Sequence, residues 1–199
     1  MGNKKCNKGK LFVISGPSGV GKGTVLSYLM ENKNVNIMYS ISATTRDPRP
    51  DEIDGEDYFF ISEEDFFTKK KNNEFIETAE VHNNYYGTPR ENVVENLNKG
   101  NNIILEIDIQ GAKQIRSQFN QAILIFLEPP TFSELEERLN KRGSENKKNK
   151  KIRLNNAKNE LKEKVIFDYT VVNKNIKQAA EEIQEIIIKE TDKEEYNND

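Results

Sequence analysis

The chain has 199 residues and a net charge of −3 at pH 7; 35% of its residues are hydrophobic and 32% are charged. This length suits one domain with a core of its own. The slightly acidic balance, without a basic stripe interleaved with aromatic residues, argues against a nucleic-acid-binding protein. No apolar run reaches the roughly 18 residues of a membrane-spanning helix, so we expect no integral membrane segment.

The single cysteine, Cys6, excludes an internal disulfide framework and favours a reducing, cytoplasmic location. Residues 1–9 are basic, and we expect a disordered tail there. The segment 1–6 also resembles a myristoylation signal, with Cys6 where Ser or Thr is preferred, so acylation at Gly2 is the alternative. We expect residues 191–199 to form a polar C-terminal tail.

Apolar strand patterns alternate with helical patterns along the chain. The apolar runs lie at 11–15, 103–108, 123–127 and 169–172, and a helical pattern follows each of them. Continuous Ile, Leu and Val runs are typical of parallel strands that are buried on both faces. We therefore predict an α/β fold with a parallel sheet flanked by helices, and a further strand at 39–42.

Two segments differ in composition from this core. Residues 42–92 contain prolines, many aromatic residues and short alternating strand patterns, which predict an inserted lobe with a mixed β-sheet. Residues 138–153 are polar and lysine-rich, which indicates a lid with little to bury.

Two helix starts carry capping patterns. Ser62 is followed by Asp65, and Thr131 by Glu134, each three residues further on. A hydroxyl at this position can accept a hydrogen bond from the backbone of the first helical turn, so we expect helices to begin after Ser62 and Thr131.

The most informative stretch follows the first predicted strand directly. A glycine-rich turn and a lysine that opens a helix form a P-loop, in which backbone N–H groups, the helix dipole and the lysine charge bind phosphate. We expect ATP-binding residues at Gly16, Pro17, Ser18, Gly19, Val20, Gly21, Lys22, Gly23 and Thr24. A glycine-rich turn that binds nothing is the alternative.

Gly23 stands where this motif usually has Ser or Thr, and the hydroxyl comes one residue later, at Thr24. Direct ligation of Mg²⁺ by the loop is therefore not expected. We expect Mg²⁺ to be held through phosphates and water, near Asp108, which ends the apolar run 103–108.

Arg46 and Arg49 lie three residues apart in a turn that Pro48 and Pro50 stiffen. Two guanidinium groups converging on one phosphate is one interpretation of this spacing, because arginine presents paired donors in a plane. A solvated basic turn is the other. Tyr58 and Tyr86 offer phenolic donors for the same anion or, alternatively, pack in a core.

Together these motifs resemble the guanylate kinase family, in order and spacing, over nearly the whole chain. The segments that carry the resemblance are 16–24, 42–50, 55–60, 74–80, 84–88, 107–111, 138–153 and 172–173. The resemblance implies a core sheet of about five parallel strands, a GMP-binding lobe and a helical lid. It also implies Mg²⁺-dependent transfer of the ATP γ-phosphoryl group to GMP, and to dGMP, giving ADP and GDP in purine nucleotide metabolism.

The implied layout is a single domain at 10–190. Its core comprises 10–41, 93–134 and 160–190, its GMP-binding lobe 42–92 and its lid 135–159. The substrates ATP and GMP or dGMP are the implied partners, and no obligate protein partner is implied.

The resemblance also assigns the residues that read the base. Guanine presents two donors, N1–H and the 2-amino group, which a carboxylate accepts together, and Glu77 matches the guanine-reading carboxylate of the family. Asp108 matches a second acceptor, and this role competes with a place beside Mg²⁺. The remaining GMP-binding positions that match are Ser42, Arg46, Arg49, Tyr58, Tyr86, Gly87 and Thr88.

Catalytic positions match as well. Cations that close on the transferring phosphoryl group stabilise its spread charge. The matching residues are Lys22, Arg46, Arg138, Arg142 and Arg153, and Asn173 matches the adenine-side loop. Two rival functions remain: a non-catalytic scaffolding module of the same fold, and a kinase that acts on AMP or another monophosphate.

Overall fold

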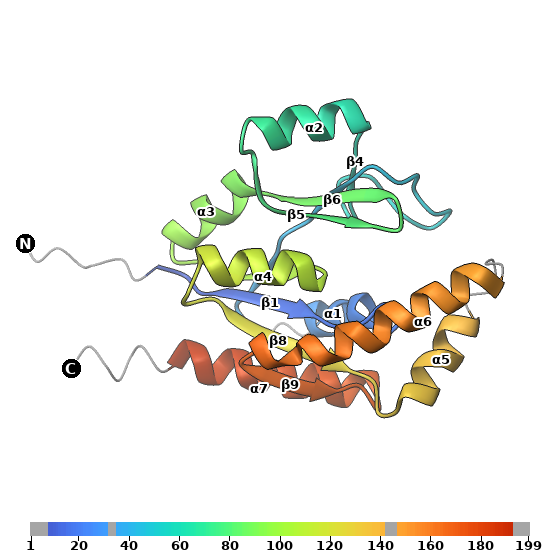
Figure 1. The fold of residues 1–199 in the computed structure, drawn as a ribbon. Coiled ribbons are helices and arrows are strands. Elements are labelled where there is room, and N and C mark those ends of the chain that lie inside the picture. The colour runs from blue at the N-terminus through green and yellow to red at the C-terminus, as the bar shows by residue number, and fades with distance from the viewer. Residues whose placement is uncertain (1–7, 32–34, 142–146, 193–199) are drawn as a thin grey trace, which may run out of the picture. The chain divides into compact units, whose positions relative to one another are not determined.

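The computed structural model describes residues 8–31, 35–141 and 147–192, and gives backbone only for 141 and 147–153. Figure 1 shows its elements. The strands are β1 Leu11–Ser15, β2 Met38–Tyr39, β3 Ala43–Thr44, β4 Phe59–Phe60, β5 Phe75–Val81, β6 Asn84–Pro89, β7 Ile103–Glu106, β8 Ile123–Glu128 and β9 Tyr169–Val172. The helices are α1 Lys22–Glu31, α2 Glu63–Lys71, α3 Arg90–Asn98, α4 Ile109–Gln118, α5 Phe132–Lys141, α6 Lys147–Lys162, η1 Glu163–Ile166 and α7 Ile176–Asp192.

The strands form two sheets. A five-stranded sheet has the order β2-β7-β1-β8-β9, with parallel pairing of β2 to β7, β1 to β8 and β8 to β9. A four-stranded sheet has the order β4-β3-β6-β5 and mixes parallel with antiparallel pairs. The predicted α/β class, the five-stranded parallel sheet and the mixed sheet within 42–92 are thus confirmed.

The chain divides into two compact units. The first comprises Met1–Leu11, Ile37–Leu105 and Gln110–Ala122, and the second comprises Phe12–Asn36, Glu106–Ile109 and Ile123–Asp199.

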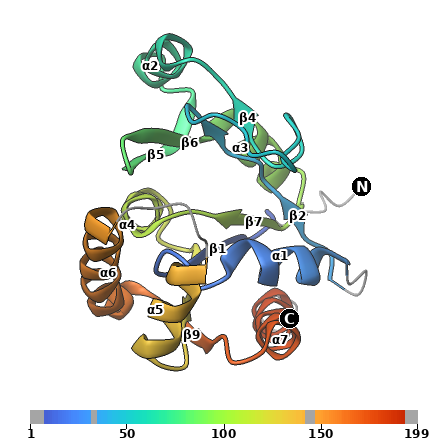
Figure 2. The same ribbon diagram turned by 90° about the vertical axis from the view of Figure 1, so that its right-hand side faces the viewer.

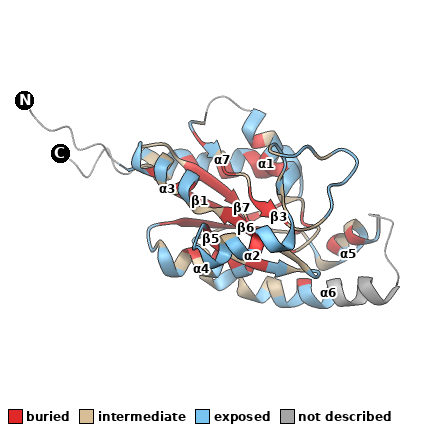
Figure 3. Ribbon diagram, turned by 90° about the horizontal axis from the view of Figure 1, so that it is seen from above, coloured by how far each residue is buried: buried red, intermediate tan, exposed pale blue. Residues whose placement is uncertain are grey.

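The core of the second unit is built on strands that are buried along their length. Every residue of β1 is buried (Figure 3). In β8 only the last residue, Glu128, is partly exposed. Helices α1 and α7 pack against each other, and α7 contributes buried isoleucines such as Ile183 and Ile187. The continuous apolar runs therefore reflect burial on both faces of a parallel sheet, as the sequence predicts.

The first unit has its own aromatic core beneath α2. The Phe66 ring stacks on Phe75 and on Tyr85, with centroid distances of 4.9 and 5.5 Å. The predicted cap fixes the start of α2, because Ser62 Oγ accepts a hydrogen bond from Asp65 N at 3.0 Å. In the second unit, Thr131 Oγ1 likewise accepts from Glu134 N at the start of α5. Both predicted caps are confirmed.

Two predicted strands are shorter than expected. The strand predicted at 39–42 is only Met38–Tyr39, because Ser42 already pairs with the other sheet, where its carbonyl accepts from Phe59 N. Residues 40–42 thus cross between sheets. The run 103–108 leaves the sheet after Glu106, and α4 begins at Ile109. Among the described residues, we find no helix of the length and hydropathy required to cross a membrane.

Candidate active site

The loop between β1 and α1 makes close approaches that a side chain would prevent. Gly16 has φ +151°, and a Cβ there would lie 2.1 Å from Leu127 O. Gly21 has φ +97°, and its Cβ would lie 2.9 Å from Asn173 Nδ2. Glycine is therefore required at both positions for the backbone to wrap as it does. The predicted strand, turn and helix of a P-loop are all present.

Lys22 opens α1 and folds back over this loop. Its Nζ donates to Gly16 O at 2.8 Å, so the ammonium group lies over the turn that precedes its own helix. The first helical hydrogen bond, from Val25 N to Gly21 O at 3.0 Å, follows at once. A positive charge and a helix N-terminus thus meet at one turn, which is the arrangement that binds phosphate. Thr24 is exposed in the first turn of the helix.

Two predicted residues from distant segments contact the loop at Val20. Buried Asn173, which follows β9, donates from Nδ2 to Val20 O at 2.8 Å. Arg138 of α5 donates from Nη1 to Val20 O at 3.2 Å and from Nη2 to Asn173 O at 3.0 Å. Figure 2 shows α5, β9 and the end of β1 in the second unit. The structure thus brings Arg138 and Asn173 to the P-loop, and their functional roles stay predictions.

The second unit supplies one contact to the loop that sequence reasoning missed. Glu160 of α6 accepts a hydrogen bond from Ser18 N at 3.2 Å through Oε2. Glu160 is the one acidic residue in the sequence of the lysine-rich helix α6, and no motif distinguishes it. Only the docking of α6 reveals this contact.

The surroundings of Gly23 bear on the expected metal ion. A Cβ at Gly23 would lie 3.5 Å from Glu106 Oε2, so a carboxylate stands beside the start of α1. Within the described ranges, no three His, Cys, Asp or Glu side chains cluster closely enough to bind a metal ion on their own. This donor set fits a hydrated Mg²⁺ held mainly by phosphates, because magnesium keeps several waters and takes one or two carboxylates.

The first unit holds a buried polar network on β5 and β6. Glu77 is only 3% exposed, and its Oε1 accepts hydrogen bonds from Thr88 N at 3.0 Å and from Thr88 Oγ1 at 2.7 Å. Thr88 Oγ1 lies 2.9 Å from Ser42 Oγ. Three residues that the sequence assigns to one base therefore lie together. A buried carboxylate is costly unless it is hydrogen-bonded, and this network satisfies that requirement.

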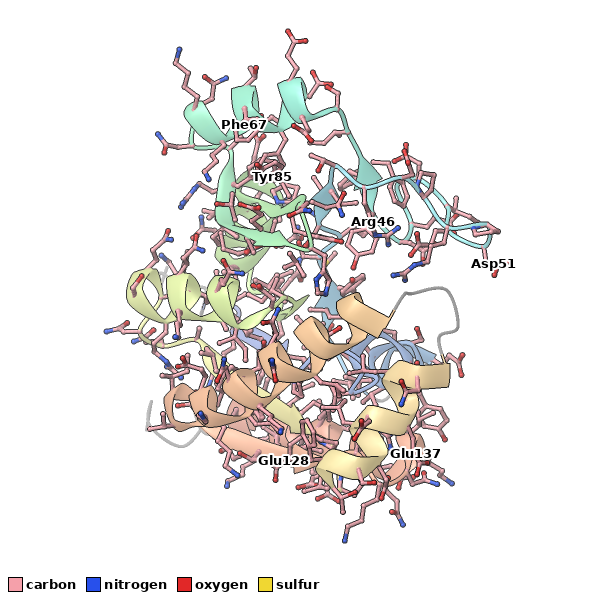
Figure 4. All side chains as sticks on the ribbon, turned by 45° about the vertical axis from the view of Figure 1, so that its right-hand side comes forward. Arg46, Asp51, Phe67, Tyr85, Glu128 and Glu137 are labelled. Atoms are coloured by element: carbon pink, nitrogen blue, oxygen red, sulfur yellow. The ribbon has the colours of Figure 1, made fainter. Side chains whose placement is uncertain are left out.

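A second polar cluster lies in the loop between β3 and β4. Arg46 forms a bidentate pair with Glu52, with Nη1 to Oε2 and Nη2 to Oε1 both at 2.6 Å. Its guanidinium carbon lies 5.0 Å from the Tyr58 ring centroid, within cation–π range. Figure 4 shows Arg46 at the base of this loop and Asp51 near its tip.

The other predicted phosphate residues lie near Arg46. The Tyr58 and Tyr86 ring centroids are 6.1 Å apart. Arg49 donates from its backbone N–H to Glu52, while its side chain is 65% exposed. Gly87 lies in β6 opposite Ala43. The turn therefore presents one anchored arginine and one extended into solvent.

The Arg46–Glu52 ion pair shifts the pKa values of both side chains. The hydrogen bonds from Arg46 lower the pKa of Glu52, burial opposes this shift, and the Arg49 N–H adds to it. The hydrogen bond to Glu52 raises the pKa of Arg46. Glu52 thus stays ionised and holds Arg46 in a fixed position.

This pair predicts a pH dependence of stability. Because the folded-state pKa of Glu52 is depressed, its contribution is fully present above the unfolded pKa of about 4.3 and is lost as the pH falls through the folded-state value. Urea unfolding of Glu52→Gln should therefore show a lower free energy of unfolding at neutral pH and a weaker decline in acid than the unsubstituted chain. Exposed Glu56→Gln is the control, and equal declines for Glu52→Gln and the unsubstituted chain would contradict the assignment.

Three further predicted residues are Arg142, Arg153 and Asp108. Arg142 lies outside the described residues, and of Arg153 only the backbone, in α6, is described. Asp108 is half-buried and belongs to the second unit. Their roles stay predictions.

A phosphate-binding loop on a parallel sheet, together with a lobe that holds a buried carboxylate in one cluster and an anchored arginine in another, defines a P-loop nucleotide kinase. Comparison with known proteins supports the same class of protein. The family model "Guanylate kinase" matches residues 8–190. This chain belongs to the guanylate kinase family, whose members are nucleoside monophosphate kinases, and a guanylate kinase function is supported.

Individual relatives cover nearly the whole chain. It is 48% identical to a guanylate kinase of Clostridium tetani over 90% of this chain and 86% of that one. It is 45% identical to that of Caldanaerobacter subterraneus subsp. tengcongensis over 96% and 93%. The crystal structure of guanylate kinase from Anaplasma phagocytophilum superposes with a TM-score of 0.79 and 36% identity, over 92% of this chain and 87% of that one.

Proposed function

We propose that this protein transfers the γ-phosphoryl group of ATP to GMP, and to dGMP, giving ADP and GDP with the help of Mg²⁺. The single observation that carries the proposal is the buried Glu77 carboxylate, hydrogen-bonded to Thr88, which in turn contacts Ser42. We propose a role in purine nucleotide metabolism, and the cytoplasmic location expected from the single cysteine stays a prediction.

The network supports guanine as the base. Thr88 donates to Oε1 of Glu77 and orients the carboxylate, which accepts N1–H and the 2-amino group of guanine. Adenine would present its N1 acceptor to the same group and leave a buried carboxylate poorly paired. A site that loses buried hydrogen bonds with the wrong ligand can discriminate by several powers of ten. Asp108 is proposed as a second acceptor.

The cluster around Arg46 supports binding of the monophosphate. Glu52 and Tyr58 fix the guanidinium group before a ligand arrives, so little conformational freedom is lost on binding. Arg49, Tyr86 and the Tyr58 hydroxyl complete the proposed set of donors. The exposed side chain of Arg49 can move onto a phosphate, because its hydrogen bond to Glu52 is long, with 3.5 Å between Nη1 and Oε1.

The proposed reaction depends on the positioning of the two nucleotides more than on proton transfer. The second pKa of a phosphate monoester is near 6, so the attacking oxygen of GMP is already ionised at neutral pH. Lys22 binds the triphosphate, and Arg138, Arg142 and Arg153 are proposed to offset the charge that spreads over the moving phosphoryl group. A bound Mg²⁺ would neutralise phosphate charge, with Glu106 and Asp108 as the nearby carboxylates of this chain.

The domain layout is part of the proposal. We assign 42–92 to GMP binding, 135–159 to a lid and the rest of 10–190 to the core, with a tail at 1–9. The C-terminal tail predicted at 191–199 overlaps the last two residues of α7, which ends at Asp192. The scaffolding alternative requires a chain without phosphotransfer. It is disfavoured by Lys22, which such modules typically lack.

A coupled assay of ADP release tests the function. With ATP and Mg²⁺ present, we expect ADP formation with GMP and dGMP and none above background with AMP. ADP formed with AMP but not with GMP would overturn the specificity. No ADP with any acceptor would favour the scaffolding alternative.

A further inference from the structure

The strand that carries Glu77 lies at the edge of its sheet, and side chains of one helix cover that edge. β5 is the last strand of the four-stranded sheet and pairs there with β6 alone. The free edge of such a strand exposes unpaired N–H and C=O groups. Figures 1 and 2 both show α4 beside β5 within the first unit.

Three glutamines of α4, four residues apart, hydrogen-bond to this edge; we call Gln110, Gln114 and Gln118 the glutamine ladder. The contacts are Gln110 Nε2 to Glu80 O at 3.0 Å, Gln114 Nε2 to Thr78 O at 2.6 Å, Thr78 N to Gln114 Oε1 at 3.1 Å, and Gln118 Nε2 to Ile76 O at 3.1 Å. The helix and the strand therefore run antiparallel and bond at alternate strand residues.

The spacing explains why a helix can do this. Four residues of an α-helix rise about 6 Å, and two residues of an antiparallel strand rise about 6.8 Å. Side chains four residues apart on the helix therefore meet backbone groups two residues apart on the free edge of the strand. Gln114 reproduces a strand partner, because its amide both donates to and accepts from Thr78.

Glu77 lies between the two ladder contacts at this end of the strand. Its preceding carbonyl, Ile76 O, accepts from Gln118, and the following amide, Thr78 N, donates to Gln114. On the opposite edge, Glu77 pairs with Thr88 of β6. The Gln118 amide is itself oriented, because its Oε1 accepts from Arg90 Nη2 at 3.0 Å. The backbone at Glu77 is thus fixed from both sides.

We propose that the glutamine ladder, and Gln114 above all, positions Glu77 for guanine recognition; this inference rests on the proposed function. Gln114 is half-buried and makes two hydrogen bonds to one residue of β5, whereas Gln110 and Gln118 are exposed. Because Thr88 already engages Oε1 of Glu77, the strand cannot shift without turning the carboxylate away from the base. Small misplacements of a recognition group are costly when the site is rigid.

Gln114→Glu tests the inference with little change in volume. The new side chain can still accept from Thr78 N, but it sets a carboxylate oxygen against Thr78 O, where no hydrogen bond can form. We expect the KM for GMP to rise about 10-fold, the value of one good hydrogen bond, while kcat and the KM for ATP stay within about twofold. The preference for GMP over IMP, which lacks the 2-amino group, should fall.

Two further variants complete the design. Gln121→Glu adds the same charge at an exposed turn after α4 and should match the unsubstituted chain in all three constants. Gln114→Met removes both hydrogen bonds without adding charge and should raise the KM for GMP in the same way. Gln114→Met therefore tests the inference even if Gln114→Glu does not fold.

The outcomes separate this inference from the proposed function. An unsubstituted chain that phosphorylates GMP, with unchanged KM for GMP in both Gln114 variants, would overturn the inference alone. Loss of folding in both Gln114 variants would overturn it too. So would equal rises in the KM for GMP and the KM for ATP together with a lower Tm, because the ladder would then serve only the fold. An unsubstituted chain without GMP turnover would overturn the proposed function and this inference with it.

Discussion

Lys22→Ala is expected to lower kcat for GMP phosphorylation by at least about 100-fold, because the substitution removes a charge that stabilises the transferring phosphoryl group. The ammonium group lies over the turn of the P-loop, 2.8 Å from Gly16 O, and a bound phosphate would replace this internal partner. Initial-rate kinetics at saturating ATP and GMP measure the loss. The KM values should change less than kcat, because the interaction is strongest in the transition state.

A matched control is available in another helix of the same unit. Lys177 also lies in the first turn of a helix, α7, and its side chain is 63% exposed. Lys177→Ala should leave kcat unchanged. If Lys22→Ala turned over GMP as fast as Lys177→Ala, the lysine would have no part in transfer, and the scaffolding interpretation would regain weight.

Glu77→Gln is expected to lower kcat/KM for GMP by about 100-fold or more, since two charge-assisted hydrogen bonds to the base are lost or weakened. The amide oxygen can still accept from Thr88 N and Thr88 Oγ1, so the fold should be retained. Its NH₂ group, however, would face a guanine donor. The specificity constants for GMP and IMP measure the effect, and GMP should lose more because IMP lacks the 2-amino group.

Glu80→Gln is the control on the same strand. Glu80 is exposed on β5, and only its backbone joins the glutamine ladder. Its variant should keep full activity with both nucleotides. Equal GMP turnover by Glu77→Gln and by the unsubstituted chain would remove Glu77 from base recognition, and with it the observation on which the specificity rests.

The long buried strands were predictable from the sequence, but the bounds and the pairing of the short ones were not. β1 and β9 have the predicted bounds because continuous apolar runs report burial on both faces. β3 and β4 have two residues each; the alternating patterns within 42–92 predict short strands, but not the distant pairing of Ala43 with Phe59 and Gly87. No local pattern contains that pairing, and for the same reason the sequence predicts a strand through the crossover at 40–42.

The candidate site shows the same division between local and distant causes. The P-loop and the turn that carries Arg46 and Arg49 each involve residues close in sequence, so motif and spacing indicate them directly. The contact of Glu160 with Ser18 spans 142 residues and depends on how α6 docks. The glutamine ladder had a signal, glutamines at 110, 114 and 118, but without the edge of β5 that spacing looks like an ordinary solvated helix face.

A crystal structure with GMP and a non-hydrolysable ATP analogue tests the account most directly. We predict the guanine N1 and 2-amino group within hydrogen-bonding distance of Glu77, the monophosphate against Arg46 and Arg49, and the triphosphate in the loop 16–24. GMP bound elsewhere, with the arginine turn facing bulk solvent and no phosphate beside it, would contradict the account.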